Sequence, residues 1–175
     1  MSTKRPYTLW LMGPTSSGKS AVAECFVKIL SENNLPVLHY DGDEIRGFFG
    51  QDFGFSESNR GRVAETLAYL AKKTNDAGID VVVSALTAHQ SARDYIKDHI
   101  LNLLVGFVDC PINICAERDP KGLYEKARSG EISTLIGYNS VYIPPVNPDI
   151  KLDTNYFSVE ENSQRLIKFL NIPIS

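Results

Sequence analysis

A short stretch near the start of the chain restricts the possible folds more than any other feature. Gly13 is followed after four residues by Gly18-Lys19-Ser20, between a short apolar run and a helical pattern. This spacing is typical of loops that cradle the phosphates of ATP or GTP. Small residues let backbone N–H groups converge on phosphate oxygens, and the next helix adds donors and a favourable dipole. The motif therefore predicts nucleotide binding.

The loop also contains candidate ligands for the nucleotide and for its metal ion. Lys19 is expected to reach the β- and γ-phosphates of the nucleotide, and the hydroxyl of Ser20 to bind Mg²⁺. The remaining candidate nucleotide-binding residues are Gly13, Thr15, Ser16, Ser17 and Gly18. The alternative is a Gly- and Ser-rich turn that only resembles the motif. The strand before it and the helix after it favour the phosphate loop.

Apolar runs and helical patterns alternate along the rest of the chain. This alternation predicts an α/β fold, a three-layer sandwich with a mostly parallel sheet, as in P-loop NTPases. With 175 residues the chain is expected to form a single domain, 1–175. Strands are expected at 7–12, 37–40, 80–84, 103–109 and 150–152, and helices at 19–32, 44–49, 56–75, 91–100, 111–118, 123–129 and 158–170.

Composition and charge exclude several partners and compartments. The net charge of −3 leaves no basic footprint for nucleic acid. The apolar run that ends at Gly13 is too short for a signal peptide or a membrane span, so we expect a cytoplasmic protein with no membrane partner. The three cysteines form no CxxC pair, and their odd number argues against a disulfide framework.

Carboxylates follow two of the expected strands. Ligands of doubly wound sheets bind beyond the carboxyl ends of the strands, so Asp41, Asp43, Asp109 and residues 84–89 are expected to share one cleft with the loop. Asp43 is the first choice for holding the metal or accepting the proton of an attacking hydroxyl. Asp43 and Asp109 are also candidate helix caps. No role is assigned to the histidines, and His39 is interpreted as structural.

Two further segments carry candidate ligands. Arg46, Arg60 and Arg62 flank a cluster of phenylalanines, which suits a phosphate or sulfate beside a base. Arg118 and Lys121 lie in a charged, Gly-containing segment that resembles a lid, which we place at about 118–142. The alternatives are a solvated charged face and a mobile basic loop, respectively.

Taken together, these motifs resemble the adenylylsulfate (APS) kinases. Those P-loop kinases phosphorylate the 3′-hydroxyl of adenosine 5′-phosphosulfate. The resemblance covers about residues 7–154, and its most specific block runs from Cys115 to Ile132. It is also carried by the phosphate loop, Asp41-Gly-Asp-Glu-Ile-Arg46, Asp52-Phe-Gly-Phe-Ser56, Asn59-Arg60 and Val108-Asp109.

The resemblance implies a role for each matching residue. ATP and Mg²⁺ would be the cofactors, and Lys19, Asp43 and Lys121 the catalytic residues, with Ser20 and Asp43 at the metal. Arg118 would stack near the adenine of ATP. The acceptor would be a small nucleotide, bound by Asp41, Arg46, Phe55, Arg60, Val63, Leu86, Thr87, Lys121 and Leu135. The resemblance also implies sulfate assimilation as the pathway, and a homodimer.

The acceptor positions depart from the family pattern. Val63 replaces an Asn, Ala85-Leu-Thr-Ala88 lies where the family has Phe-Ile-Ser-Pro, and Leu135 replaces an aromatic residue. Loss of one stacking face weakens base binding by about 1–3 kcal/mol, unless Tyr138 rebuilds it. APS is therefore the leading acceptor, and another 5′-modified nucleotide such as cytidine diphosphoramidate, used in capsule modification, is the alternative. A regulatory module without turnover is a third hypothesis, which the joint presence of Lys19, Ser20, Asp43 and Lys121 opposes.

Overall fold

The structure is a computed structural model that describes residues 5–50 and 53–174. In this part of the chain, five parallel strands form one sheet in the order β2-β3-β1-β4-β5. The strands are β1 (Thr8–Met12), β2 (Val37–Asp41), β3 (Asp80–Ser84), β4 (Leu103–Asp109) and β5 (Ile150–Asp153). The helices are α1 (Lys19–Glu32), α2 (Gly42–Phe48), α3 (Glu57–Asp76), α4 (Gln90–His99), α5 (Ile112–Arg118), α6 (Leu123–Arg128) and α7 (Val159–Phe169).

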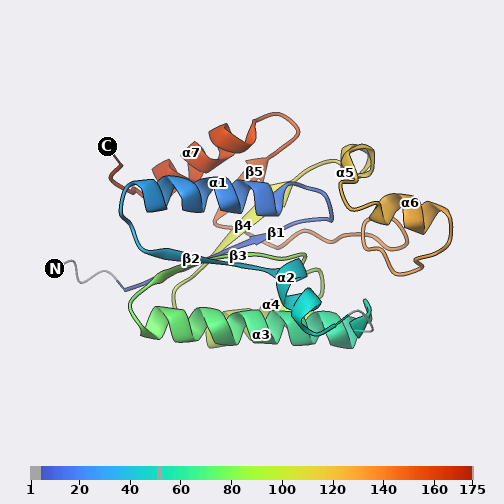
Figure 1. Ribbon diagram of the computed structural model, residues 1–175, viewed down its shortest axis with the longest axis horizontal. Helices are drawn as coiled ribbons and strands as arrows, with labels where there is room; N and C mark the ends of the chain where they lie inside the picture. Colours follow the sequence, from blue (N-terminus) through green and yellow to red (C-terminus); the bar gives the residue numbers. More distant parts are fainter. Residues whose placement is uncertain (1–4, 51–52, 175) are drawn as a thin grey trace.

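The sheet is covered by helices on both faces. Helices α1 and α7 lie on one face and α3 and α4 on the other (Figure 1). Side chains of a strand alternate between faces, so Leu9 packs towards α1 and α7 while Trp10 packs towards α3 and α4. Both faces are therefore buried, which explains why β1 reads as a continuous apolar run. The predicted three-layer α/β sandwich is confirmed.

The strands run towards one end of the molecule. Figure 1 shows α5, α6 and the chain that follows α6 gathered at that end, while both chain termini lie at the opposite end. Because all strands are parallel, the segments that leave β1, β2, β3 and β4 converge there. The fold thus concentrates the loops with candidate functional residues at one edge of the sheet.

The expected helix boundaries hold within one or two residues, and one of the differences is informative. Helix α2 begins at Gly42 rather than Glu44, because the carboxylate of Asp41 accepts hydrogen bonds from the backbone N–H groups of Asp43 and Glu44. The cap is Asp41, so the suggestion that Asp43 caps this helix was wrong. Asp52, quoted for the family resemblance, lies outside the described residues.

No helix in the described part of the chain combines the length and the apolar character that a membrane crossing requires. The buried residues of the long helix α3 recur at helical spacing, and many polar and charged residues lie between them.

The last helix provides a local stability test. The hydroxyl of Ser158 accepts from the N–H of Glu161 at 3.1 Å, and the Glu161 carboxylate accepts from the N–H of Ser158 at 2.8 Å. We expect Ser158→Ala to lower the free energy of unfolding by about 1 kcal/mol, since it removes one half of this capping box. Urea denaturation measures the change. Ser58→Ala, at an exposed serine in the first turn of α3, is the control and should be nearly neutral.

Candidate functional site

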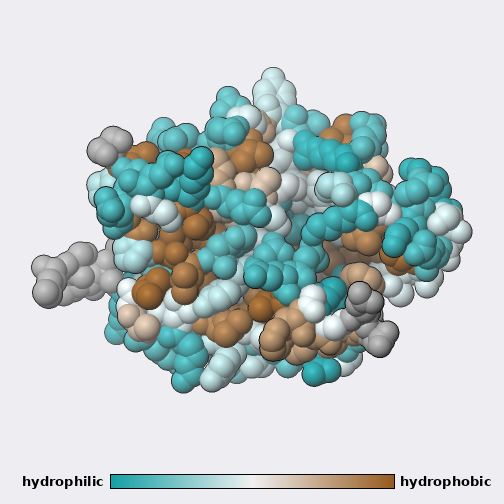
Figure 2. All heavy atoms as spheres, in the orientation of Figure 1, coloured by the Kyte–Doolittle hydropathy of each residue, from teal (hydrophilic) through white to brown (hydrophobic). Residues whose placement is uncertain are grey.

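A cavity of about 530 Å³ opens at the carboxyl ends of β1, β2 and β3. Its walls come from the phosphate loop, the start of α1, residues 41–43, residues 84–89, α3 and the segments at 118–123 and 132–135. Figure 2 shows the surface hollowed between α2 and the α5–α6 end, with mainly hydrophilic residues on the rim. Most candidate site residues named from the sequence line this cavity. Gly13 and Ser17 do not, because they are buried within the loop, and Arg62 and Asp109 are not among the lining residues either.

Two glycines make the phosphate loop possible. A Cβ atom at Gly13 would lie 2.3 Å from the carbonyl oxygen of Val108, so the loop crosses β4 too closely for any side chain. Gly18 has φ +92°, in the left-handed region that favours glycine. These two positions explain why the motif has glycine at both ends of its four-residue spacer.

Side chains from distant elements fasten the loop from outside. Tyr124 of α6 donates its hydroxyl to the carbonyl of Thr15 at 3.1 Å, and Thr154 donates to the carbonyl of Ser17 at 2.6 Å. The carbonyl oxygen of Thr154 also accepts a hydrogen bond from the guanidinium of Arg118 at 2.6 Å. Sequence reasoning missed Thr154, because nothing near it in the chain marks it as a partner of the loop.

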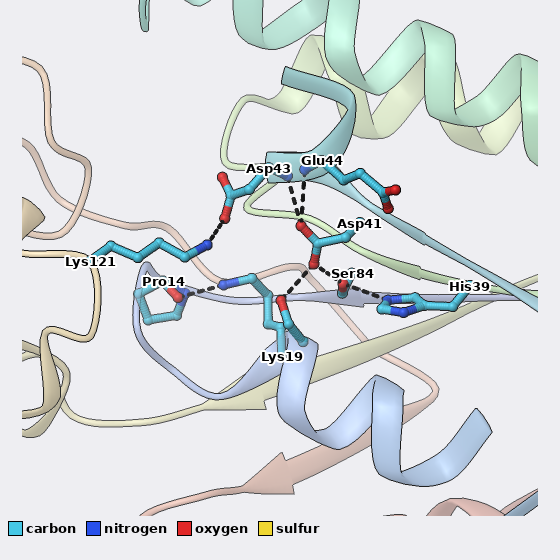
Figure 3. A network of polar contacts seen from close by, with 9 residues as sticks. Pro14, Lys19, His39, Asp41, Asp43, Glu44, Ser84 and Lys121 are labelled. Atoms are coloured by element: carbon cyan, nitrogen blue, oxygen red, sulfur yellow. Dashed lines mark hydrogen bonds and ion pairs between the residues drawn. The ribbon is translucent and has the colours of Figure 1, made fainter. Parts of the chain in front are cut away.

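Lys19 is the cation of the loop. Its ammonium donates to the carbonyl of Pro14 at 2.7 Å (Figure 3). Burial lowers the pKa of Lys19 to about 8, although the carboxylate of Asp43 acts in the opposite direction. The free energy cost of the charged form is offset when an anion lies beside it. The site is therefore complementary to a phosphate.

Asp41 lies at the centre of a polar network. One carboxylate oxygen accepts from the hydroxyl of Ser20 at 2.6 Å and from that of Ser84 at 2.5 Å, and Ser84 contacts Nε2 of His39 at 2.8 Å (Figure 3). Burial raises the pKa of Asp41, but the hydrogen bonds from Ser20, Ser84 and the backbone of Asp43 outweigh it and lower the pKa overall. Asp41 is thus an ionised carboxylate beside the loop hydroxyl.

Asp43 points elsewhere. Its carboxylate forms an ion pair with the ammonium of Lys121, which joins the start of α2 to the segment before α6 (Figure 3). The expectation from sequence placed a metal at Ser20 and Asp43, whereas the carboxylate in contact with Ser20 is Asp41. Which carboxylate serves a metal remains a prediction.

The competing carboxylate, Asp109, lies apart from this group. It pairs with Lys151 of β5 at 2.7 Å and is not among the residues that line the cavity. It does not cap α5 either, since the cap position is Pro111 and no side chain bonds there. The expectations that Asp109 shares the cavity and that it caps α5 were therefore wrong.

Arg46 and Arg60 converge on Phe55 at the other side of the cavity. Their guanidinium carbons lie 4.7 and 5.4 Å from the centre of the Phe55 ring. Arg60 is oriented by the carbonyls of Phe55 at 3.0 Å and Thr134 at 3.1 Å. Burial and the neighbouring Arg46 lower the pKa of Arg60 to about 10. Two cations held this closely favour an anion between them.

Three aliphatic side chains also line the cavity. Val63 and Leu135 are almost fully buried, and Leu86 completes this side. Phe55 is the only Phe, Tyr or Trp that lines the cavity among the described residues. Tyr138 is 48% exposed and does not line it, so it does not rebuild the second stacking face.

Thr87 is held in a rare conformation. Its φ is +41°, its hydroxyl accepts from the indole N–H of Trp10 at 2.9 Å, and its carbonyl accepts from Arg93 at 2.8 Å. The position where the family pattern departs is therefore fixed by the sheet core on one side and by α4 on the other.

The donor set suits an oxygen-loving cation that also binds phosphates. Among the described residues no three His, Cys, Asp or Glu side chains gather as a metal cluster. A hydroxyl and a carboxylate remain, from Ser20 and Asp41. Mg²⁺ commonly binds one or two such protein oxygens together with substrate phosphates, so these residues fit Mg²⁺ carried in with a nucleotide.

Comparisons with known proteins agree on one family. A family model described as adenylylsulphate kinase matches residues 5–153. The chain is 40% identical over 164 residues to the adenylyl-sulfate kinase of Buchnera aphidicola, covering 93% of this chain and 77% of that protein. It is 38% identical over 168 residues to the adenylyl-sulfate kinase of Vibrio cholerae, covering 92% and 76%.

A solved structure extends the likeness to the fold. The Mycobacterium tuberculosis APS kinase CysC, in complex with AMPPNP and APS, superposes with a TM-score of 0.89 at 35% identity. The match covers 95% of this chain and 98% of that one. That relative binds an ATP analogue and APS together.

Proposed function

The chain belongs to the adenylylsulphate kinase family, and we propose from this that it transfers the γ-phosphoryl group of ATP to the ribose 3′-hydroxyl of APS. One observation carries the proposal: a single cavity holds the phosphate loop with Lys19 at one side and the pair Arg46 and Arg60 at the other. Two separate anion sites that face one cavity suit two nucleotides held for transfer between them.

The donor half would bind ATP. The N–H groups of Gly13, Thr15, Ser16, Ser17 and Gly18 would surround the phosphates, and Lys19 would neutralise charge on the β- and γ-phosphates. Arg118 would stack on the adenine. Its bond to Thr154, which also holds the loop, supports this role because it places the base and the phosphates in a fixed relation.

Mg²⁺ would neutralise charge on the transferring phosphates when bound. Ser20 would provide its hydroxyl oxygen to the cation. Asp41 would orient that hydroxyl by accepting a hydrogen bond from it. Asp43 is the alternative carboxylate at the metal. Its position beside Lys121 rather than Ser20 favours a role at the acceptor hydroxyl.

The transfer itself would rest on Asp43 and Lys121. Asp43 would accept the proton of the 3′-hydroxyl as that oxygen attacks the γ-phosphorus. Lys121 would stabilise the charge that develops on the transferring group. Arg46 and Arg60 would hold the phosphosulfate of the acceptor, with Phe55 against its base. Asp41, Val63, Leu86, Thr87 and Leu135 would complete the acceptor side.

A second acceptor is favoured by one observation. A single aromatic ring, Phe55, lines the cavity among the described residues, and Leu135 provides an aliphatic wall where the family has an aromatic one. A purine is held less tightly by such a pocket. Another 5′-modified nucleotide, such as cytidine diphosphoramidate, is therefore the second candidate acceptor, with the same donor half and the same chemistry.

The test is ADP release from MgATP, with APS, with a panel of adenosine and cytidine 5′-nucleotides, and with no acceptor. Efficient turnover with APS supports the leading proposal. Turnover with a cytidine diphosphate derivative but not with APS would show that the acceptor half is specific for another nucleotide. No ADP release with any acceptor of the panel would favour a nucleotide-binding module without turnover.

Phe55 provides a test of the acceptor side alone. We expect Phe55→Leu to raise the KM for the acceptor about 10-fold, since stacking on one aromatic face contributes about 1–3 kcal/mol. The KM for ATP should not change, because Phe55 lies on the side of the arginine pair. Phe48→Leu is the matched control: Phe48 is 84% exposed and does not line the cavity. An equal rise in both KM values would contradict this assignment.

Residues 118–142 would act as a lid over both nucleotides. The Lys121–Asp43 ion pair and the bond from Arg60 to Thr134 support this proposal, since both join the segment to the body of the protein across the cavity. A single domain over 1–175 and a cytoplasmic location stay predictions from the sequence. A homodimer and a place in sulfate assimilation stay predictions that rest on the family.

A further inference from the structure

The polar network around Asp41 extends beyond the residues that the proposed reaction uses. Ser84 and His39 continue it, from Asp41 to the middle of the edge strand β2. Ser84 is almost fully buried, and His39 is half-buried at a position where its neighbours in the sheet are apolar. Figure 3 shows these residues in a row between the phosphate loop and β2.

Strand register explains why these side chains meet. Asp41 of β2 and Ser84 of β3 are direct partners in the parallel ladder. His39 precedes Asp41 by two residues, and residues two apart on a strand share one face of the sheet. Ser20, in the first turn of α1, reaches the same face. To form the network, the pattern His39-x-Asp41 on β2 therefore needs only one residue of the neighbouring strand β3, which is Ser84.

The hydroxyl protons available in the network determine which group donates each hydrogen bond. An ionised carboxylate only accepts, so Ser20 and Ser84 each use their single hydroxyl proton on the same oxygen of Asp41. Ser84 then has no proton for His39, and the contact of 2.8 Å requires His39 to donate from Nε2. This holds for the neutral Nε2–H tautomer and for the charged ring alike.

The direction matters at Ser20. Because its proton is directed to Asp41, the lone pairs of its hydroxyl oxygen face away from that carboxylate and are available to a cation. If Asp41 rotates, Ser20 regains freedom to turn its proton towards the phosphates. The other carboxylate oxygen of Asp41 is held by the backbone of α2, so Ser84 is what fixes the oxygen that faces Ser20.

We propose that His39 and Ser84 are positioning residues that direct Asp41, and through it Ser20, to bind the divalent cation of the nucleotide complex. This inference rests on the proposed function in one respect, the binding of a metal–nucleotide complex at Ser20. It assigns His39 and Ser84 a role in metal affinity rather than in nucleotide affinity. Residues that orient a metal ligand commonly contribute 10-fold or more to metal affinity.

The experiment measures Mn²⁺ binding to the AMPPNP complex of the full chain by electron paramagnetic resonance. Ser84→Ala removes the bond to Asp41, and His39→Leu removes the donor to Ser84 and puts an apolar side chain of similar size in its place. His39→Gln is the matched variant, because its amide can donate from near the place of Nε2. AMPPNP affinity in EDTA is measured in parallel, and this affinity would fall if the variants merely damaged the fold.

We expect Ser84→Ala and His39→Leu each to weaken Mn²⁺ binding about 10-fold. The Mn²⁺ affinity of the double variant should be no lower than that of the more impaired single variant, because both substitutions break the same network. His39→Gln should restore most of the affinity. AMPPNP affinity in EDTA should stay within about twofold of the wild-type value. Unchanged Mn²⁺ affinity in Ser84→Ala and His39→Leu would overturn the inference. So would an equal loss of metal-free nucleotide affinity.

These outcomes are separable from the fate of the proposed function. If the wild-type protein binds Mn²⁺ and AMPPNP but phosphorylates no acceptor, the kinase proposal fails, while the metal affinities of the variants still decide the role of His39. If the wild-type protein turns over and the variants bind Mn²⁺ normally, only the role of His39 and Ser84 is overturned.

Discussion

Lys19→Ala is expected to abolish phosphoryl transfer to any acceptor, with a loss of about a thousandfold in kcat/KM. Lys19 is the cation inside the phosphate loop, and burial lowers its pKa to about 8, so its charge is best stabilised by an anion beside it. Charge on the transferring phosphates would then lack its main protein counterion. ADP release from MgATP with the best acceptor of the panel measures the loss.

A second lysine on the same helix provides the control. Lys28 is 75% exposed and forms an ion pair with Glu32, one turn along α1. Lys28→Ala should keep normal turnover, because an exposed pair of this kind contributes little. Retained turnover in Lys19→Ala would rule out the assignment of the phosphate loop itself, whichever acceptor is used.

Asp43→Asn is expected to lose at least about 100-fold in kcat while ATP affinity stays normal. Asparagine keeps the size of the side chain but cannot accept the proton of the attacking hydroxyl. The lost ion pair with Lys121 should barely affect folding, since the two side chains are 61% and 52% exposed and surface pairs are weak. Single-turnover kinetics and ATP binding separate the two effects.

Asp98→Asn, at an exposed position in α4, is the control for removing a surface carboxylate. Near-normal turnover in Asp43→Asn would transfer the proton-accepting role to Asp41, whose carboxylate lines the cavity and contacts Ser20 of the loop. Asp109 is the weaker candidate, because its carboxylate is directed to Lys151.

The sequence predicts well what local chemistry decides. The loop motif places a strand before it and a helix after it, and both are confirmed, as are all five strands and the capping box at Ser158. The same residues identify the donor half of the cavity. These features depend on neighbours in the chain, and their spacing is therefore visible without a structure.

The sequence predicts less well what register and packing decide. Asp41 and Asp43 are two residues apart and look equivalent on paper, yet one caps α2 and contacts Ser20 while the other reaches Lys121. That difference depends on where β2 ends beside β3. Thr154 escaped notice for a similar reason, since 137 residues separate it from Ser17.

The acceptor side was predicted only in part. Arg46, Arg60 and Phe55 do converge, as the charged aromatic pattern indicated. The position of the Tyr138 side chain depends on the path of the chain after α6. Gly137, with φ +100°, turns the chain just before this tyrosine. No local signal reports where a side chain points after such a turn.

The bond from Trp10 to Thr87 has a practical consequence for spectroscopy. Trp10 is the only tryptophan of the chain and is fully buried, and its indole N–H donates to a hydroxyl in the wall of the cavity. Indole emission shifts in wavelength and intensity when that hydrogen bond or its surroundings change. Filling of the acceptor side should therefore alter intrinsic fluorescence, while filling of the donor side alone should alter it less. The unlabelled protein thus contains its own optical reporter, placed where the identity of the acceptor is decided.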